Sequence, residues 1–348
     1  MPPSGSAPLL GRSVSISGLG AHVPARVVTN DDLAAVLDTS DQWIKQRTGI
    51  VERRVVDQGA SSSDLGIIAG QKALSDAGID PLRIDLVITA TISPDRIMPA
   101  TASRVALECG CGRAGACDLS AGCTGFVYAL AMAAAAVASG LHEHVLVVGA
   151  EALSRITDWE DRATAVLFGD GAGAVVVSPG DAAGGRILGF DLGNDGSGEE
   201  LLMVPAGGSR LPASCSTVEK RQHFIKMNGK EVFKFATRVV AESAGRVLER
   251  CGLDVDDVDL FVPHQANLRI IDSAAVKLGI PGYKVYTNVD RYGNTSCASI
   301  PLCLCDARAE GRLKAGDHVL LVGFGAGLTW GACLMEWGGS SAVTTGRE

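Results

Sequence analysis

The sequence predicts an α/β protein made of two similar halves, residues 12–183 and 184–337. Two observations support this prediction. Segments of the first half resemble segments of the second half, in the same order and at a nearly constant distance along the chain. Within each half, apolar runs typical of buried strands alternate with amphipathic stretches typical of helices. This alternation favours parallel-rich sheets whose faces are covered by helices.

Three ordered pairs of segments indicate the duplication. The first pair, ALSDAGIDPLRIDLVITAT and VLERCGLDVDDVDLFVPHQ, is typical of a helix end, a glycine stop, an acidic turn and a strand. In the second pair, Cys123 and Asn294 each lead into a predicted helix that ends at a glycine 17 residues further on. The third pair, HVLVVGA and HVLLVGF, is typical of a buried strand. Equivalent turns of the two halves can therefore be compared.

Composition and charge exclude several classes of protein. The 348 residues are 47% hydrophobic, which excludes a disordered or fibrous chain. A net charge of −8 disfavours general binding of nucleic acid, whose phosphates are held by lysine and arginine. The longest apolar run, 129–138, is too short to span a membrane. The start of the chain lacks the pattern of a secretory leader, so we expect a cytoplasmic protein with ten reduced cysteines.

Three residues with chemical potential lie where predicted strands run into helices. Cys123 follows the strand CDL, Asn294 occupies the equivalent turn of the second half, and His264 follows the strand FVP. Functional groups gather at the carboxyl ends of strands in such sheets. Unpaired N–H groups and the dipole at a helix start lower a cysteine pKa, so we expect Cys123 to be a thiolate nucleophile.

Taken alone, each residue has a simpler interpretation. Most free cysteines are buried and inert, and asparagine commonly caps helices. Together the three fit one reaction, in which Cys123 attacks a thioester while His264 and Asn294 donate hydrogen bonds to an enolate formed by decarboxylation. The glycine string 323–327 follows a buried strand, and its N–H groups could bind an oxyanion beside Cys123.

The remaining cysteines and glycines predict no metal or cofactor. Cys109-x-Cys111 and Cys303-x-Cys305 lack the two-residue spacing usual at zinc sites. The glycine string 169–173 leads into the strand AVVV rather than a helix, which disfavours phosphate binding. We expect these glycines to permit close packing between layers.

Segments around the three residues resemble the β-ketoacyl-acyl carrier protein synthase III family: DLSAGCTGF at Cys123, VPHQANLRI at His264 and YGNTSCASIP at Asn294. The resemblance extends from TSDQWIKQRTGIVERR near the start to GFGAGLTWG near the end. It implies a duplicated thiolase fold with a layered α-β-α-β-α core. It also implies a homodimeric acyltransferase that initiates type II fatty-acid synthesis by decarboxylative Claisen condensation, with coenzyme A thioester as substrate and no cofactor.

The resemblance also implies roles for individual residues. An acyl-coenzyme A primer would acylate Cys123, and His264 and Asn294 would stabilise the enolate of malonyl-acyl carrier protein. The N–H groups of Cys123 and Ala326 would form the oxyanion hole, although many relatives have glycine where this chain has Ala326. The residues expected to bind coenzyme A are Trp43, Arg47 and Arg162.

A basic stretch could serve an acidic carrier protein. Residues 219–238 hold six basic and two acidic side chains, against the overall charge of the chain. Such a run is usually a solvated face, but together with the resemblance it favours docking. The expected docking residues are Lys226, Gln265, Ala266, Asn267, Leu268 and Arg269.

The resemblance implies that one residue of the acyl pocket comes from a partner subunit. In the segment SPDRIMP this residue is Met98, which would cross a dimer interface and close the pocket. A methionine within the core is the alternative. Because methionine is flexible, we expect the pocket to accept short primers, including branched ones.

Other functions share parts of this pattern. A chain-elongating synthase would use two histidines, whereas the second turn here carries Asn294. A non-catalytic partner subunit would lack the nucleophile, which is present as Cys123. A specialised synthase III of a secondary-metabolite pathway would share all three residues, and this alternative stays open, as does the identity of the primer.

Overall fold

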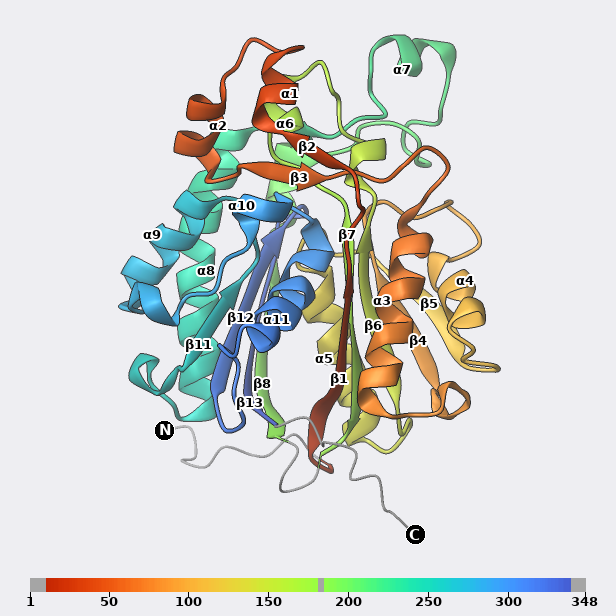
Figure 1. Ribbon diagram of the computed structural model, residues 1–348, viewed down its shortest axis with the longest axis vertical. Helices are drawn as coiled ribbons and strands as arrows, with labels where there is room; N and C mark the ends of the chain where they lie inside the picture. The colour runs from red at the N-terminus through yellow and green to blue at the C-terminus, as the bar shows by residue number, and fades with distance from the viewer. Residues whose placement is uncertain (1–10, 181–184, 339–348) are drawn as a thin grey trace.

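Two β-sheets lie on either side of a central pair of helices (Figure 1). The computed structural model describes residues 11–180 and 185–338. The first sheet has the order β1 (Val14–His22), β7 (Gly171–Pro179), β6 (Val145–Glu151), β4 (Leu86–Ala90) and β5 (Gly115–Leu119). The second has the order β11 (Leu260–Pro263), β12 (His318–Gly325), β13 (Thr329–Trp337) and β8 (Gly185–Asn194).

Helices form three layers around these sheets. The central layer is α5 (Gly125–Ala138) and α11 (Ser299–Ala309), which pack between the two sheets. The outer face of the first sheet is covered by α3 (Ser62–Ala77) and α4 (Thr101–Glu108). The outer face of the second is covered by α8 (Gly229–Cys251) and α9 (Leu268–Leu278). The layers alternate as α-β-α-β-α, which is the predicted architecture.

The central strands are buried on both faces. In β6, Val145 and Val147 pack against the central helices, whereas Leu146 and Val148 pack against the outer layer. Successive side chains of a strand point to opposite faces, so a strand between two helix layers must be apolar throughout. This explains the uninterrupted run VLVV, which recurs as VLLV in β12.

Strand directions differ from the prediction of parallel-rich sheets. Strands β5, β4 and β6 pair in parallel, but β7 runs antiparallel to both β6 and β1. In the second sheet only β11 and β12 are parallel. For β12 and β13 the connection explains the antiparallel pairing, because parallel neighbours need a long crossover and only residues 326–328 join these two strands.

The two sheets correspond in order, since β4, β6, β7 and β1 have counterparts in β11, β12, β13 and β8. Both α3 and α8 end at a left-handed glycine, Gly78 with φ 63° and Gly252 with φ 69°. These features support the duplication. The boundary predicted between 183 and 184 lies outside the described residues and stays a prediction.

The glycine string 169–173 lets α11 pack closely on β7. A Cβ atom at Gly173 would lie 2.7 Å from the Pro301 side chain, and one at Gly171 would lie 3.1 Å from Leu302. The contact at Gly173 excludes a side chain there, which confirms the predicted packing role for this glycine. All ten cysteines are free. No helix of the described residues is both long enough and apolar enough for a membrane span.

Smaller elements cap the carboxyl ends of the strands. They include the paired strands β2 (Val27–Thr29) and β3 (Glu52–Arg54), and the short pair β9 (Leu202–Met203) and β10 (Lys226–Met227). The short helices are α1 (Asn30–Ala34), α2 (Asp41–Thr48), α6 (Arg162–Ala165), α7 (Cys215–Glu219) and α10 (Val289–Tyr292). In Figure 1 the α1, α2 and α6 group lies above both sheets, where it can form the rim of a site.

Candidate active site

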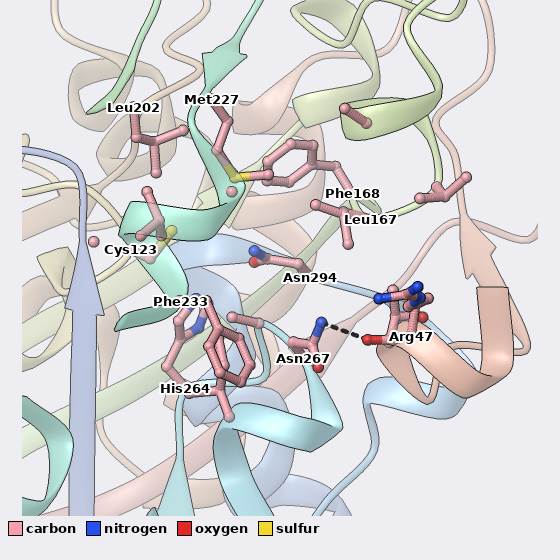
Figure 2. A pocket seen from close by; sticks show the side chains of 18 of the residues that line it. Arg47, Cys123, Leu167, Phe168, Leu202, Met227, Phe233, His264, Asn267 and Asn294 are labelled. Atoms are coloured by element: carbon pink, nitrogen blue, oxygen red, sulfur yellow. Dashed lines mark hydrogen bonds between the residues drawn. The ribbon is translucent and has the colours of Figure 1, made fainter. Parts of the chain in front are cut away.

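A pocket of about 310 Å³ opens at the carboxyl ends of β11 and β12 and beside the turn that follows β5 (Figure 2). Its walls include Cys123, His264 and Asn294, so the structure brings together residues from three separate turns. Trp43 and Arg47 of α2 also line it. Apolar side chains complete much of the wall, among them Leu167, Phe168, Leu202, Met227 and Phe233.

Cys123 is held where the backbones of the two halves touch. Gly122 has a φ of 56°, and a Cβ atom there would lie 2.5 Å from the Ala326 nitrogen. A Cβ atom at Gly325 would overlap the Cys123 nitrogen. Glycine is therefore required on both sides of this contact. The close approach places the N–H groups of Cys123 and Ala326 in neighbouring loops, as an oxyanion hole requires.

The ionisation of Cys123 differs from the expectation of a thiolate. Its side chain is buried, and desolvation raises the pKa of the thiol to about 12. A hydrogen bond from the Ser296 hydroxyl opposes this shift, while the charge of Glu151 adds to it. Helix α5 begins only at Gly125, two residues beyond the cysteine. Desolvation favours the neutral form, so the resting group is a thiol.

This ionisation predicts how Cys123 reacts with iodoacetamide. We expect its labelling rate to rise about tenfold for each pH unit between pH 7 and 9, because only the thiolate reacts and its fraction grows tenfold per unit below the pKa. Peptide mass spectrometry at several times and pH values measures the rate, and a Cys123→Ser variant identifies the peptide. A rate that levels off below pH 8 would contradict the high pKa.

His264 is buried at the end of β11 with one ring nitrogen occupied. Its Nδ1 forms a 2.7 Å hydrogen bond with Ser299 Oγ, and its ring lies edge-on to Phe324 at 5.3 Å between centroids. Nε2 is buried and has no hydrogen-bond partner among residues 11–180 and 185–338. Burial lowers the pKa of His264 to about 3, so the ring is neutral near pH 7. A neutral imidazole with a free Nε2 can exchange a proton with a ligand in the pocket.

Asn294 presents its amide nitrogen to the pocket. Its Oδ1 accepts a 2.9 Å hydrogen bond from the Ser296 backbone N–H, which leaves Nδ2 as the group free to donate. The Asn294 backbone is fixed by its own N–H, which donates to the Leu167 carbonyl at 2.8 Å. The Asn294 backbone carbonyl accepts a hydrogen bond from the Gly169 N–H at 3.0 Å. This pairing joins the second-half turn to the loop before β7.

Two arginines flank Trp43 at the rim of the pocket. The guanidinium carbons of Arg162 and Arg47 lie 5.0 Å and 5.9 Å from the centre of the Trp43 ring. Arg162 does not itself line the pocket, but the next residue, Ala163, does. An aromatic ring between two exposed cations suits a ligand that combines a flat ring with negative charge.

Comparisons with known proteins show the family of this chain. The family description "3-Oxoacyl-[acyl-carrier-protein (ACP)] synthase III" matches residues 117–196, and its C-terminal counterpart matches residues 248–337. A β-ketoacyl-[acyl-carrier-protein] synthase III of Symbiobacterium thermophilum is 53% identical over 327 residues, covering 94% of this chain and 99% of the relative. The chain belongs to the β-ketoacyl-acyl carrier protein synthase III family. It is therefore an acyltransferase of the condensing-enzyme type.

Solved structures of synthase III proteins share the fold. The enzyme of Thermus thermophilus is 50% identical with a TM-score of 0.85, covering 93% of this chain and 99% of the other. A priming β-ketosynthase of the R1128 polyketide pathway is 38% identical with a TM-score of 0.87, covering 97% and 99%. The predicted thiolase fold is confirmed.

The structure corrects part of the docking surface expected for a synthase III. Gln265 is buried, and its Nε2 donates to the Pro263 carbonyl at 2.7 Å. Its Oε1 accepts from the Asn288 N–H at 3.0 Å. This glutamine ties two loops together and cannot meet a partner protein. Lys226 Nζ lies 3.1 Å from the buried Asp158 carboxylate, which partly neutralises its charge.

The other expected docking residues lie at the start of α9. Asn267 caps this helix by accepting from the Arg269 N–H, and its Nδ2 donates to the Arg47 carbonyl at 3.0 Å (Figure 2). Ala266 lines the pocket, and Leu268 packs under Gly49. Only Arg269 is exposed, with its guanidinium 5.4 Å from the Phe233 ring.

Met98 is on the surface of this chain. Its side chain is 81% exposed and does not line the pocket, so the alternative of a core methionine is wrong.

Sequence reasoning missed Ser299 and Glu151. Ser299 follows Asn294 by five residues and supports His264, whereas Glu151 is a carboxylate at the end of the buried strand β6. A charged residue at the end of an apolar strand was the available signal.

Proposed function

We propose that this protein joins an acyl-coenzyme A primer to malonyl-acyl carrier protein by decarboxylative Claisen condensation. The products are 3-oxoacyl-acyl carrier protein, carbon dioxide and coenzyme A, and the reaction initiates type II fatty-acid synthesis in the cytoplasm. The observation that supports this proposal best is the convergence of Cys123, His264 and Asn294 on one apolar pocket. No cofactor is needed, because the thioester substrates carry the activated acyl groups.

In the first half-reaction the acyl group passes to Cys123. The sulfur of Cys123 forms a bond with the acyl carbon, and the bond from that carbon to the sulfur of coenzyme A breaks. The N–H groups of Cys123 and Ala326 stabilise the oxyanion. Because the resting cysteine is a thiol, its proton must move, and neutral His264 accepts it through the unpartnered Nε2. His264 keeps this proton on Nε2, and the departing coenzyme A thiolate takes a proton from water.

In the second half-reaction malonyl-acyl carrier protein occupies the vacated space. Loss of carbon dioxide leaves an enolate, whose oxygen accepts hydrogen bonds from His264 Nε2–H and Asn294 Nδ2. The enolate carbon attacks the acyl carbon on Cys123, and the carbon–sulfur bond to the cysteine breaks. The released Cys123 thiolate takes back the proton from His264 Nε2, which restores the thiol and the neutral ring. Both donors are already oriented, His264 by Ser299 and Asn294 by the Ser296 N–H, so little reorganisation is required.

An assay of product mass tests this function. The protein is incubated with malonyl-acyl carrier protein and with acetyl-, isobutyryl- or longer acyl-coenzyme A, and the carrier protein is weighed by mass spectrometry. A 3-oxoacyl-acyl carrier protein is the expected product, and its absence with every primer would refute the proposal. The comparisons favour fatty-acid synthesis over a secondary-metabolite pathway, since identity is 53% with the synthase III relative and 38% with the polyketide priming enzyme.

Carrier-protein docking should depend on Arg269. Reversing its charge with Arg269→Glu should raise the apparent KM for malonyl-acyl carrier protein about threefold to tenfold at low salt, because rim charges govern encounter with an acidic partner. Acylation by acyl-coenzyme A should stay unchanged. Lys314→Glu, an exposed site before the amino end of β12, is the matched control. An unchanged KM at low salt would exclude Arg269 from docking.

A homodimer through the edge of the first sheet would bring Met98 to a partner's pocket. Strand β5 pairs only with β4, so its other edge is free among the described residues. Two exposed apolar side chains, Ile97 and Met98, precede α4, which packs beside β5. An unpaired strand edge near exposed apolar groups is typical of an interface.

The size of the Met98 side chain should then set primer length. Met98→Phe should reduce the use of isobutyryl-coenzyme A more than acetyl-coenzyme A, because overpacking a closed site costs about 1–3 kcal/mol. Met98→Ala should admit longer primers. Primer competition assays and sedimentation measure these effects, with Ile97→Ala as the neighbouring control. An unaltered acyl profile, or an active monomer, would show that Met98 is not the gate.

A further inference from the structure

Arg53 of β3 is a fully buried cation with no carboxylate partner in the described part of the chain. Its side chain is 0% exposed, and no acidic oxygen of those residues lies within 4.0 Å of its guanidinium. Burial lowers the pKa of Arg53 only to about 10, so it carries its charge at neutral pH. A buried charge without a counter-ion is costly and calls for a specific reason.

The guanidinium of Arg53 joins the end of α6, which lines the pocket, to β2 and α1. Nη2 donates to the Val166 carbonyl at 2.9 Å, and Val166 directly follows α6, which begins with Arg162. Nη1 donates to Asn30 Oδ1 at 3.0 Å and to the Val28 carbonyl at 3.2 Å. One planar side chain therefore holds the end of α6 against the group formed by β2 and α1.

Asn30 carries this connection on to α2. Its Nδ2 donates to the Asp41 carboxylate in the first turn of α2 at 3.0 Å. The same nitrogen donates to the Ile50 carbonyl, just beyond the helix, at 2.8 Å. Both ends of α2 are thus attached to Asn30, and Asn30 is attached to Arg53. Trp43 and Arg47 lie on the helix held in this way.

We propose that Arg53 is a positioning residue for the nucleotide end of acyl-coenzyme A, because it sets α2 against α6 and so sets Arg162 and Arg47 about the ring of Trp43. This inference rests on the proposed function, which assigns that cluster to coenzyme A. Arg53 itself is buried and does not line the pocket. A guanidinium presents donors from separate nitrogens in a fixed fork, which the single nitrogen of a lysine does not reproduce.

The position of Arg53 predicts a selective effect on substrates. Disturbing the Trp43 cluster should weaken binding of coenzyme A thioesters, which carry an adenine ring and phosphates. It should not affect an acyl-pantetheine thioester, which reaches Cys123 without those groups. A role confined to general stability would instead impair both substrates equally.

Single-turnover acylation of Cys123, followed by intact mass, tests this inference. For Arg53→Lys we expect the acetyl-coenzyme A concentration at half-maximal rate to rise about tenfold. The rate with acetyl-pantetheine should stay within about twofold of wild type. Arg54→Lys is the matched control, because Arg54 lies next on β3 and pairs with Glu52 instead. Asn30→Ala keeps the Arg53 cation but breaks its link to α2, and it should show the same selectivity between the two substrates. This variant tests the inference if Arg53→Lys does not fold.

Trp43→Ala separates this inference from the proposed function. Suppose that Trp43→Ala raises the acetyl-coenzyme A concentration at half-maximal rate while Arg53→Lys and Asn30→Ala do not. The positioning role of Arg53 is then refuted, and the assignment of the Trp43 cluster to coenzyme A stands. If Arg53→Lys and Asn30→Ala slow the acylation of Cys123 equally with acetyl-coenzyme A and with acetyl-pantetheine, the positioning role is also refuted. If Trp43→Ala has no effect, the assignment of the cluster to coenzyme A fails, and the inference fails with it.

Discussion

Replacing Cys123 by serine should abolish transfer of the primer acyl group, with a loss of at least about 10³-fold in the rate of self-acylation. A serine hydroxyl ionises far less readily than a thiol, and the buried site offers no cation to assist it. The condensation that depends on the acyl-enzyme should be lost to the same extent. Intact-mass measurement after incubation with acetyl-coenzyme A gives the result directly.

Cys297→Ser is the matched control for this experiment. Cys297 is also buried, and its thiol donates to the Gly122 carbonyl at 3.1 Å, immediately before the nucleophile. Serine at 297 can make the same hydrogen bond, so we expect self-acylation to persist. An acyl group found on any cysteine other than Cys123 in the wild-type protein would overturn the assignment of the nucleophile.

Removing the enolate donors should have the next largest effect. His264→Ala and Asn294→Ala should each reduce decarboxylation of malonyl-acyl carrier protein by about 10²–10³-fold, as loss of one preorganised donor commonly does. The two variants should differ in self-acylation. Asn294→Ala should retain it, whereas His264→Ala should slow it, because a neutral Cys123 thiol needs a proton acceptor.

Two separate measurements distinguish these roles. Release of carbon dioxide from malonyl-acyl carrier protein reports decarboxylation, and intact mass after exposure to acetyl-coenzyme A reports self-acylation. Fast acylation in His264→Ala would show that the cysteine loses its proton without the imidazole. Equal losses of both activities in Asn294→Ala would contradict a role restricted to the enolate.

Much of the architecture follows from local sequence patterns. Gly78 and Gly252 mark helix ends because only glycine adopts the left-handed cap easily, and this constraint acts within a few residues. Asn294 does not follow the predicted strand, since the short helix α10 (Val289–Tyr292) precedes it. The positions of Cys123 and His264 after strands were legible, because carboxyl ends of neighbouring strands share an edge. Strand direction was not, since it depends on whether a connection returns at once or crosses over.

Properties set by distant parts of the chain could not be predicted. The high pKa of Cys123 arises from its burial beneath elements of both halves. Gln265 looked like a surface residue beside His264, but Asn288 and Tyr286 enclose its amide. Arg53 lies in a run of two arginines, and only the folded chain shows that one is interior and the other pairs with Glu52.

The contact of Gly122 with Ala326 has a consequence for the history of the fold. The turn that carries Cys123 is shaped by a loop from the other half, so neither half alone can form the proposed oxyanion hole beside Cys123. A single ancestral half would have needed a second copy of itself to form the same contact. Fused copies can diverge in sequence, which would leave the proposed nucleophile, Cys123, in one half and the proposed amide donor, Asn294, in the other.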